Sequence, residues 1–565
     1  MVMAACGGFV EHGGLLLGVM HMTLAVQLLR ALKAQGAREI FGIPGDFILP
    51  FFKHIEGSGI LPLVSLSHEP ALGFAADAAA RMNLGLGVLA VTYGAGALNV
   101  VNAVAGAYAE QSPVVVLAGA PGTAEGHGGL VLHHQVRHLD SQWRIYQEIT
   151  CDQVRLDDPL TAPGLIARAL RSCREYSQPV LIEIPRDMAD RVIGEVPVLP
   201  PSPVVRAAVD ECAEEWLTRI RAAKAPVLVL DVEVRRFRLE DKVAELARRL
   251  DLPVLTTFMG RGLLADAGLD VRGTYLGVAG DREVSRLLDD SDLPVMLGAI
   301  LSDSNFGVSA QRMDFRRALI AARREARVGH HVYHDIPLAD LVDALLARVA
   351  VASPTRPPSP PPSVPRGLRA DESPVRAADL SMALNDCIER YGRIPIASDI
   401  GDCLFAAMEL SPTPLAAPGY YASMGFGVPA GMGMQVTSGE RTLILVGDGA
   451  FQMTGWELGN CRRYGLDPIV IVLNNQSWEM IRAFQPESQC AALGDWRYAD
   501  LANVLGGDGY RVRTRAQLKS ALDTAFTTGG RFQLIEVMLP AGDCTPTLAR
   551  FSEGIRALRA RANVT

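Results

Sequence analysis

The sequence predicts an α/β protein built from three doubly wound, parallel-sheet domains. Apolar runs of strand length alternate with segments of helical spacing in three regions, which is typical of parallel sheets covered by helices. Proline-rich segments separate these regions, and 565 residues exceed what one hydrophobic core usually holds. We expect domains at residues 22–195, 204–350 and 370–565, with a proline-rich linker at 351–369.

Composition argues against several classes of function. The chain has 49% hydrophobic and 21% charged residues and a formal net charge of −8, as in an ordinary globular enzyme. No block of Lys or Arg stands out, so a nucleic-acid role has little support. The nine cysteines are dispersed and include no Cys-x-x-Cys pair. This pattern favours reduced thiols in a cytoplasm over a disulfide framework or a zinc site.

The N-terminal segment, residues 1–21, is rich in glycine and differs from the rest of the chain. Its apolar run, Leu15–Met20, lacks the basic flank of a signal peptide and is too short to span a membrane. No other segment has membrane length, and amphipathic periodicity begins at Met22. We therefore expect residues 1–21 to be a non-essential extension, with Met22 as a candidate start.

Apolar, β-rich runs predict strands in the first and central regions. Those of the first region are Glu39–Ile43, Gly87–Thr92, Pro113–Ala118 and Pro179–Ile184. The central region contributes Ala225–Asp231 and Leu293–Leu297. No Gly-x-Gly-x-x-Gly follows a strand between 205 and 350, so there is no positive sign of FAD binding there. The proline clusters Val196–Pro203 and Pro354–Pro365 favour extended backbone and mark the boundaries between regions.

Two polar motifs end neighbouring predicted strands of the third region. The run 442–446 leads into Gly447-Asp448-Gly449, and the run 468–473 leads into Asn474-Asn475, with a predicted helix at 451–463 between them. Ligands of open α/β sheets bind at the carboxyl ends of the strands. An Asp and an Asn there offer hard oxygen ligands for Mg²⁺, which phosphates usually complete. The flanking glycines would let a diphosphate approach the backbone, so the motifs predict a Mg²⁺–diphosphate site.

These motifs belong to a longer series. In order come Phe41–Asp46, Glu69, Thr92–Ala97, the pair His133-His134 and the metal motif. The series resembles the thiamin diphosphate (ThDP)-dependent 2-oxo acid decarboxylases, and the match covers nearly everything from Met22 onward. It is most similar to the bacterial phenylpyruvate and indolepyruvate decarboxylases, on the stretches Leu132–Asp140, Thr257–Asp266, Gly298–Asp303, Gly419–Pro429 and Phe484–Ser488. The resemblance implies three domains of the pyruvate decarboxylase type.

The resemblance also implies how the cofactor is held. Glu69, which opens an alanine-rich helix, would hydrogen-bond the aminopyrimidine ring and drive activation of the thiazolium carbon. The alternative for Glu69 is an ordinary N-terminal helix charge, stabilised by the helix dipole. Met424 would hold the cofactor bent, although a Met is equally ordinary as core filler. The implied diphosphate and metal residues are Gly447, Asp448, Gly449, Asn475 and Ser477, of which Asp448, Asn475 and Ser477 would bind Mg²⁺.

Asp46, His133 and His134 are the residues that the resemblance assigns to substrate chemistry. The enamine left by decarboxylation must be protonated before the aldehyde leaves, and acids within hydrogen-bond reach can supply the proton. Without that context, adjacent histidines in a loop are most often a solvated surface pair. The expected catalytic set is therefore Glu69, Asp46, His133 and His134.

One position departs from the pyruvate decarboxylases. They carry a catalytic Glu six residues after the second Asn of the metal motif, where this chain has Ile481. Glu479 lies two residues earlier, and a helix turns about 100° per residue, so its side chain should point elsewhere. An apolar residue suits an arylmethyl substrate better than a methyl ketone. Trp478, Ile481 and Phe484 would border the substrate, unless they are core residues of the helix.

The expected function is non-oxidative decarboxylation of an aromatic 2-oxo acid, phenylpyruvate or indolepyruvate, to the aldehyde and CO₂ with ThDP and Mg²⁺. A ThDP-dependent carboligase, a branched-chain 2-oxo acid decarboxylase and a catalytically silent homologue are the alternatives. The dispersed cysteines predict a cytoplasmic location, and the resemblance implies a homodimer or homotetramer with active sites at subunit interfaces. The expected partner is a small-molecule 2-oxo acid, with no nucleic acid and no membrane.

Overall fold

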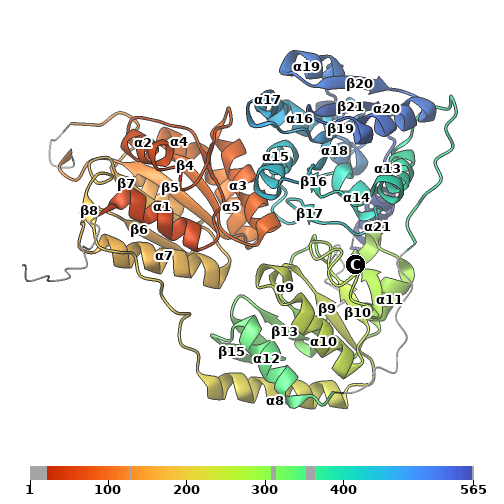
Figure 1. Cartoon of the computed structure of the whole chain (residues 1–565). Coiled ribbons are helices and arrows are strands. Elements are labelled where there is room, and N and C mark those ends of the chain that lie inside the picture. Colours follow the sequence, from red (N-terminus) through yellow and green to blue (C-terminus); the bar gives the residue numbers. More distant parts are fainter. Residues whose placement is uncertain (1–21, 126–129, 307–313, 352–362, 563–565) are drawn as a thin grey trace, which may run out of the picture.

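The computed structural model describes residues 22–125, 130–306, 314–351 and 363–562. The predicted extension 1–21 and most of the predicted linker 351–369 lie outside the described residues. Three sheets follow one another along the chain, each flanked by helices, so the predicted α/β class is confirmed (Figure 1). Every strand predicted above coincides with an observed one, apart from shifts of one or two residues at the ends.

The first sheet is parallel throughout, with the order β3-β2-β4-β5-β7-β6. Its strands are β2 (Ile40–Gly42), β3 (Leu63–Val64), β4 (Gly87–Val91), β5 (Val114–Ala120), β6 (Asp152–Arg155) and β7 (Val180–Pro185). Around it lie α1 (Leu24–Ala34), α2 (Leu49–Ser58), α3 (Glu69–Asn83), α4 (Ala95–Asn99), α5 (Val101–Ala109), α6 (Ser141–Tyr146) and α7 (Ala162–Tyr176). A short antiparallel pair, β1 (Met22–Thr23) and β8 (Val192–Ile193), joins the two ends of this region.

The central sheet departs from the prediction, because one edge is antiparallel. Its order is β11-β10-β9-β12-β13-β14-β15, and β14 and β15 run against their neighbours. Arg323 and Arg324 turn the chain between β13 and β14 with φ of 52° and 59°, as a two-residue hairpin requires. The strands are β9 (Pro226–Leu230), β10 (Val254–Thr256), β11 (Val271–Thr274), β12 (Leu293–Leu297), β13 (Leu319–Ala322), β14 (Glu325–Val328) and β15 (His331–His334). The helices are α8 (Arg206–Ala222), α9 (Val232–Arg236), α10 (Glu240–Leu250), α11 (Arg282–Asp289) and α12 (Leu338–Arg348).

The third sheet is again parallel, with the order β17-β16-β18-β19-β21-β20, so the strands that precede the two polar motifs are neighbours. The strands are β16 (Ile396–Ser398), β17 (Leu415–Ala416), β18 (Leu443–Gly447), β19 (Ile469–Asn474), β20 (Asp508–Val512) and β21 (Gln533–Met538). The helices are α13 (Ala377–Tyr391), α14 (Asp402–Met408), α15 (Gly427–Ser438), α16 (Asp448–Thr454), α17 (Cys461–Tyr464), α18 (Glu479–Phe484), α19 (Tyr498–Leu505), α20 (Arg515–Thr527) and α21 (Pro546–Ala562).

The helix predicted at 451–463 is broken in the structure. The stretch comprises the end of α16, a 3₁₀ helix at Gly455–Asn460 and the start of α17. Gly455 and Gly459 fall in the 3₁₀ turn, and glycine is among the weakest helix formers. The turn also directs Glu457 toward the first region, where its carboxylate accepts a hydrogen bond from the N–H of Ser67 at 2.8 Å.

Helices α3 and α15 pack side by side and join the first region to the third (Figure 1). The contact is close because small residues face each other: a Cβ on Gly433 would lie 2.3 Å from the carbonyl oxygen of Ala75. Phe74 and Phe426 meet edge to face beside them, with ring centroids 5.6 Å apart. One hydrophobic core thus spans both regions.

Candidate active site

The polar motifs of the third region meet at the carboxyl edge of its sheet, as predicted. Asp448 opens α16 directly after β18, and Asn475 follows β19. The Asp448 side chain is 3% exposed, and its Oδ1 accepts a hydrogen bond from the N–H of Gly449 at 2.9 Å. Asn474 instead turns into the sheet, where its Nδ2 donates to Glu536 at 2.6 Å. Alternate residues of an extended strand face opposite ways, so the two amides differ in their contacts. Oδ1 of Asn474 accepts from the N–H of Gln476 at 3.2 Å, whereas Oδ1 of Asn475 accepts from the N–H of Ser477 beside Asp448.

Ser477 links the side chains of Asp448 and Asn475 at this edge. Its N–H is shared between Oδ2 of Asp448 at 3.3 Å and Oδ1 of Asn475 at 3.1 Å. The turn that permits this places Gln476 at φ 55°, in the left-handed region. The hydroxyl oxygen of Ser477 is buried without a hydrogen-bond partner in the described part of the chain. Three oxygen-bearing side chains therefore converge here.

The chemistry of this edge fits Mg²⁺. Burial raises the pKa of the Asp448 carboxyl to about 6, and the hydrogen bonds described for it come from backbone N–H groups rather than from a cationic side chain. Carboxylate, amide and hydroxyl oxygens are the ligands that Mg²⁺ takes in proteins. A bound cation would both compensate the buried carboxylate and satisfy the Ser477 hydroxyl.

The backbone around the edge is open on one side. A Cβ on Gly447 would meet only Sγ of Cys403, 4.0 Å away, so a ligand could approach there. A Cβ on Gly449 would press against Leu493 at 3.2 Å and Trp478 at 3.6 Å. Met424 is half-buried against the shared core on the neighbouring segment.

Glu69 is the first residue of α3, as predicted, and is half-buried. Its Oε2 accepts a hydrogen bond from Nδ2 of Asn99 at 2.8 Å, and the same amide lies 2.9 Å from Nε2 of His68. Among the described contacts, Glu69 is joined to these residues of its own region and not to Asp448. Asn460 also reaches Ser67 from the third region, with Nδ2 2.9 Å from the hydroxyl.

Asp46, His133 and His134 come together although they lie in separate loops. Nε2 of His133 is 2.5 Å from Oδ2 of Asp46, and the His134 ring centroid is 4.9 Å from that of His133. Phe47 packs against His133 with a centroid distance of 4.7 Å. All three polar side chains are exposed. They form an accessible cluster of proton donors and acceptors.

Trp478, Ile481 and Phe484 lie on or next to α18, just beyond Ser477. None of them is buried core: Ile481 is 47% exposed, and the other two are half-buried. Glu479 points the other way and is 8% exposed, and burial raises the pKa of its carboxyl. The helical rotation that separates residues 479 and 481 is therefore as expected.

Several contacts at these sites have no signal in the sequence. Asn99, Glu457 and Asn460 contact the start of α3 across long separations, and no motif marks them. Tyr498, whose hydroxyl lies 3.4 Å from the carbonyl oxygen of Asp448, likewise sits in an unremarkable helix. Only the packing of the sheets brings such residues to the site.

Comparisons with known proteins define the class. Residues 22–153 match the N-terminal TPP binding domain of thiamine pyrophosphate enzymes, residues 213–349 their central domain, and residues 399–537 their C-terminal TPP binding domain. Thiamine pyrophosphate is ThDP, so the three regions of the chain are those of a ThDP enzyme.

Two relatives narrow the class. The chain is 59% identical over 542 residues to indole-3-pyruvate decarboxylase of Azospirillum brasilense, covering 95% of this chain and 99% of the relative. It is 30% identical over 548 residues to alpha-keto-acid decarboxylase of Mycobacterium tuberculosis, covering 92% and 94%. The chain therefore belongs to the ThDP-dependent 2-oxo acid decarboxylases, which act on small-molecule 2-oxo acids. None of the described helices is both long and apolar enough to cross a membrane.

Proposed function

We propose that this enzyme decarboxylates aryl-substituted 2-oxo acids, phenylpyruvate and indolepyruvate, to the aldehyde and CO₂. The observation that carries the proposal is the position and exposure of the apolar side chain of Ile481. Its side chain is 47% exposed on α18, which directly follows the Asp448–Asn475–Ser477 edge, and it stands where pyruvate decarboxylases have a Glu. The exposed apolar surface suits an aryl group, and the name of the Azospirillum relative agrees with an aromatic substrate.

The cofactor sites are proposed on the same edge. Asp448, Asn475 and Ser477 would hold Mg²⁺. Gly447 would let the diphosphate approach the backbone, whereas the space beside Gly449 is filled by Leu493 and Trp478. Met424 would support the bent cofactor, and Glu69 would hydrogen-bond its aminopyrimidine ring. When bound, ThDP supplies a nucleophilic carbon and accepts the electron pair that departing CO₂ leaves behind.

Proton transfer would fall to Asp46, His133 and His134. Their short contacts and their exposure make them available to a substrate that approaches from solvent. In this proposal the cluster delivers the proton that completes the aldehyde and orients the substrate carboxylate. Because Ile481 is not an acid, these three residues carry that work without help from α18.

The proposed assembly is a homodimer or homotetramer in a cytoplasm, with domains at 22–195, 204–350 and 370–565. Glu69 opens α3 of the first region and Asp448 opens α16 of the third, and the two share no described contact within one chain. A site formed by two chains would bring them together. The cytoplasmic location is supported by the eight cysteines of the described residues, which are all unpaired.

One substrate panel tests this function. Specificity constants would be measured for pyruvate, phenylpyruvate and indolepyruvate in the parent and in Ile481→Glu. We expect the parent to prefer the aromatic acids. The substitution should lower the ratio of phenylpyruvate to pyruvate constants by at least about tenfold, because it places a charge where the aryl group would pack.

Val504→Glu is the matched control, since Val504 is an 82% exposed apolar residue on α19 of the same region. It should leave the ratio unchanged. A parent enzyme that prefers pyruvate would contradict the proposal. Product analysis with phenylpyruvate alone addresses the carboligase alternative, because an acyloin formed without free aldehyde would identify that activity instead.

A further inference from the structure

A cavity with a volume of about 680 Å³ lies between the first and the central region. The second half of α7 lines it from the first region, and Phe237, Arg324 and the start of α12 line it from the central region. The segment that connects the two regions, residues 199–204, also contributes to its surface. A cavity of this size is large enough for a small organic ligand.

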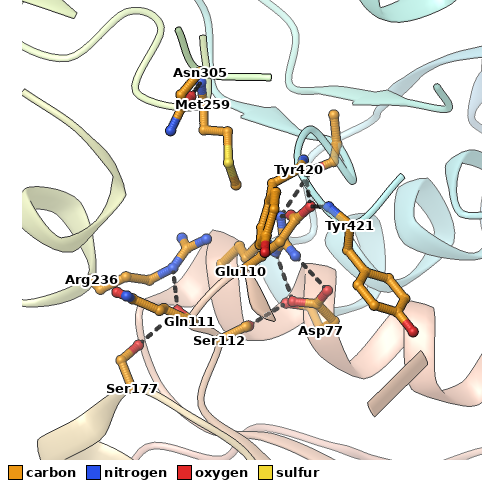
Figure 2. A network of polar contacts seen from close by, with 12 residues as sticks. Asp77, Glu110, Gln111, Ser112, Ser177, Arg236, Met259, Asn305, Tyr420 and Tyr421 are labelled. Carbon is orange, nitrogen blue, oxygen red and sulfur yellow. Dashed lines mark hydrogen bonds and ion pairs between the residues drawn. The ribbon is translucent and has the colours of Figure 1, made fainter. Parts of the chain in front are cut away.

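Polar contacts between the two regions hold the junction beside this cavity. The carbonyl oxygen of Gln111 accepts hydrogen bonds from Oγ of Ser177, at the end of α7, at 2.9 Å and from Nε of Arg236, on α9, at 3.0 Å (Figure 2). Glu175 accepts from the N–H of Ser202 in the connecting segment and, at 2.9 Å, from its hydroxyl. The walls of the cavity are therefore fixed relative to each other by the protein itself.

Four arginines and two carboxylates line the cavity, which leaves an excess of two positive charges. The arginines are Arg171, Arg174, Arg206 and Arg324, and the carboxylates are Glu175 and Asp340. Two of the arginines are paired with carboxylates. Arg206 lies 2.7 Å from Asp340, and Arg324 lies 2.6 Å from Asp335, just outside the cavity.

The other two arginines have no carboxylate partner among the described residues. Nη1 of Arg174 donates to the carbonyl oxygen of Gln35 at 2.8 Å, and no hydrogen bond or ion pair is described for Arg171 within the described part of the chain. The two residues are three positions apart on α7, so their side chains share one face of the helix. Their charges are therefore available to an anion in the cavity.

Much of the remaining surface of the cavity is apolar. It is formed by Leu199, Pro201, Pro203, Phe237 and Leu338. Phe237 is half-buried against the core of the central region. An apolar surface with a few convergent polar groups is typical of small-molecule sites. Arginine forks match the geometry of phosphate oxygens, and two unpaired cations suit a dianionic phosphate better than the single charge of a 2-oxo acid.

We propose that this cavity binds a phosphorylated small molecule with an aromatic body, of the size and charge of a nucleoside diphosphate. Arg171 and Arg174 hold its phosphate groups, and Phe237 with the neighbouring prolines contacts the aromatic body. Because the site is built from both the first and the central region, the ligand stabilises their junction. The site is separate from the Asp448 edge, since all of its lining residues precede the third region.

Isothermal titration calorimetry with ADP tests the proposal on the holoenzyme. ThDP and Mg²⁺ are held at saturation, so that the diphosphate site of the third region is filled. We expect one ADP to bind per chain, and Arg171→Ala/Arg174→Ala should raise its dissociation constant at least about tenfold through lost charge-assisted hydrogen bonds. Adenosine, which lacks the phosphates, should bind at least about tenfold more weakly than ADP. ADP should also raise the thermal midpoint of the parent protein.

Arg168→Ala is the matched control. Arg168 is an exposed arginine of the same helix, but its side chain pairs with Asp152 at 3.0 Å rather than lining the cavity. This variant should keep the dissociation constant of ADP within about twofold of the parent. Arg171→Gln/Arg174→Gln also removes both charges while retaining polar side chains, and it should lose affinity as the Ala pair does.

Equal ADP affinity in the double variant and the parent would overturn the proposal, as would a parent that binds no ADP below about 1 mM. Binding that disappears in competition with ThDP would assign ADP to the diphosphate site instead and would also overturn it. Inorganic phosphate that binds as tightly as ADP would show that the aromatic body contributes nothing, so the proposed class of ligand would be wrong.

Discussion

At the residue scale, two buried aspartates of the third region illustrate different uses of one side chain. Asp448 accepts hydrogen bonds from backbone N–H groups beside a buried hydroxyl that has no described partner. The carboxylate of Asp402, at the start of α14, is already hydrogen-bonded within the protein. The N–H and the hydroxyl of Thr545 both donate to it, the hydroxyl at 2.5 Å. The first arrangement suits a cation, whereas the second fastens the segment that begins α21.

Asp402 leads to a prediction about stability and pH. Burial raises the pKa of its carboxyl from 3.8 to about 7 in the folded protein. Between those values the unfolded chain has released the proton and the folded chain retains it, so stability falls as pH rises through this window. Asp402→Asn removes this loss. The decrease in the free energy of unfolding from pH 5 to pH 8 should be smaller than in the parent by about 1–3 kcal/mol.

Urea denaturation at the two pH values measures the effect. Asp500→Asn provides the control, since Asp500 is exposed on α19 and pairs with Arg497 at the surface. It should leave the pH dependence as in the parent. An equal pH dependence in Asp402→Asn and the parent would show that Asp402 is already ionised in the folded protein at pH 5.

At the element scale, the turn between β4 and α4 sets the place of the histidine pair. Gly94 has φ +59° and donates its N–H to Oε1 of Gln142 at 2.8 Å. A Cβ at this position would lie 2.0 Å from the carbonyl oxygen of His134, so the two backbones touch. His134 itself has φ 65°, an uncommon conformation for a residue with a side chain. The turn at Gly94 and the turn at His134 are therefore in direct backbone contact.

Gly94→Ala should therefore displace His133 and His134 from Asp46. We expect kcat with phenylpyruvate to fall by about 10- to 100-fold, because misplacement of acid groups by about 1 Å is costly. ThDP affinity should not change. Gly59→Ala is the control for a positive φ: its φ is +60° and its ψ is 16°, against a ψ of −92° at Gly94, and a Cβ there meets nothing within 4 Å. Equal losses in the two variants would mean that backbone strain, and not the contact with His134, is responsible.

At the scale of the whole molecule, α3 packs on α15 and joins the region of Glu69 to the region of Asp448. The two residues of one active site could therefore come from one chain or from two. Within one chain these helices fix the first region against the third, and Glu457 and Asn460 bond to Ser67, two residues before Glu69. The described contacts of Glu69 nevertheless stay within its own region. In the proposed dimer, Glu69 of one chain would contact the cofactor bound at the Asp448 site of the other chain.

Complementation tests the arrangement. Glu69→Gln and Asp448→Ala should each retain less than about 1% of parental activity. If each site takes Glu69 from one chain and Asp448 from the other, a heterodimer of the two variants has one intact site and one doubly altered site. Co-expressed with different affinity tags and purified through both, it should show about half the parental activity per dimer. An inactive heterodimer would place both residues of a site on one chain.

The sequence predicted the local features well and the long-range contacts poorly. The carboxyl ends of β18 and β19, Glu69 at the start of a helix and Ile481 on the next segment were all evident from periodicity, spacing and resemblance. The break in the helix predicted at 451–463 was missed. Its 3₁₀ turn accompanies the hydrogen bond between Glu457 and Ser67, which are 390 residues apart in the sequence. The antiparallel edge of the central sheet depends on a tight turn of two arginines, which no turn signature marked.

By itself the sequence determined the α/β class, the ThDP family and the chemical identity of the proposed site residues, because these depend on local pattern and residue type. Only the tertiary structure decided which way each side chain points and what anchors it. It separated Asn475 from Asn474, brought His133 to Asp46 across 87 residues, and set Glu110 against Tyr420 across 310. Such contacts follow from how whole sheets and helices pack, and the packing depends on the entire chain at once.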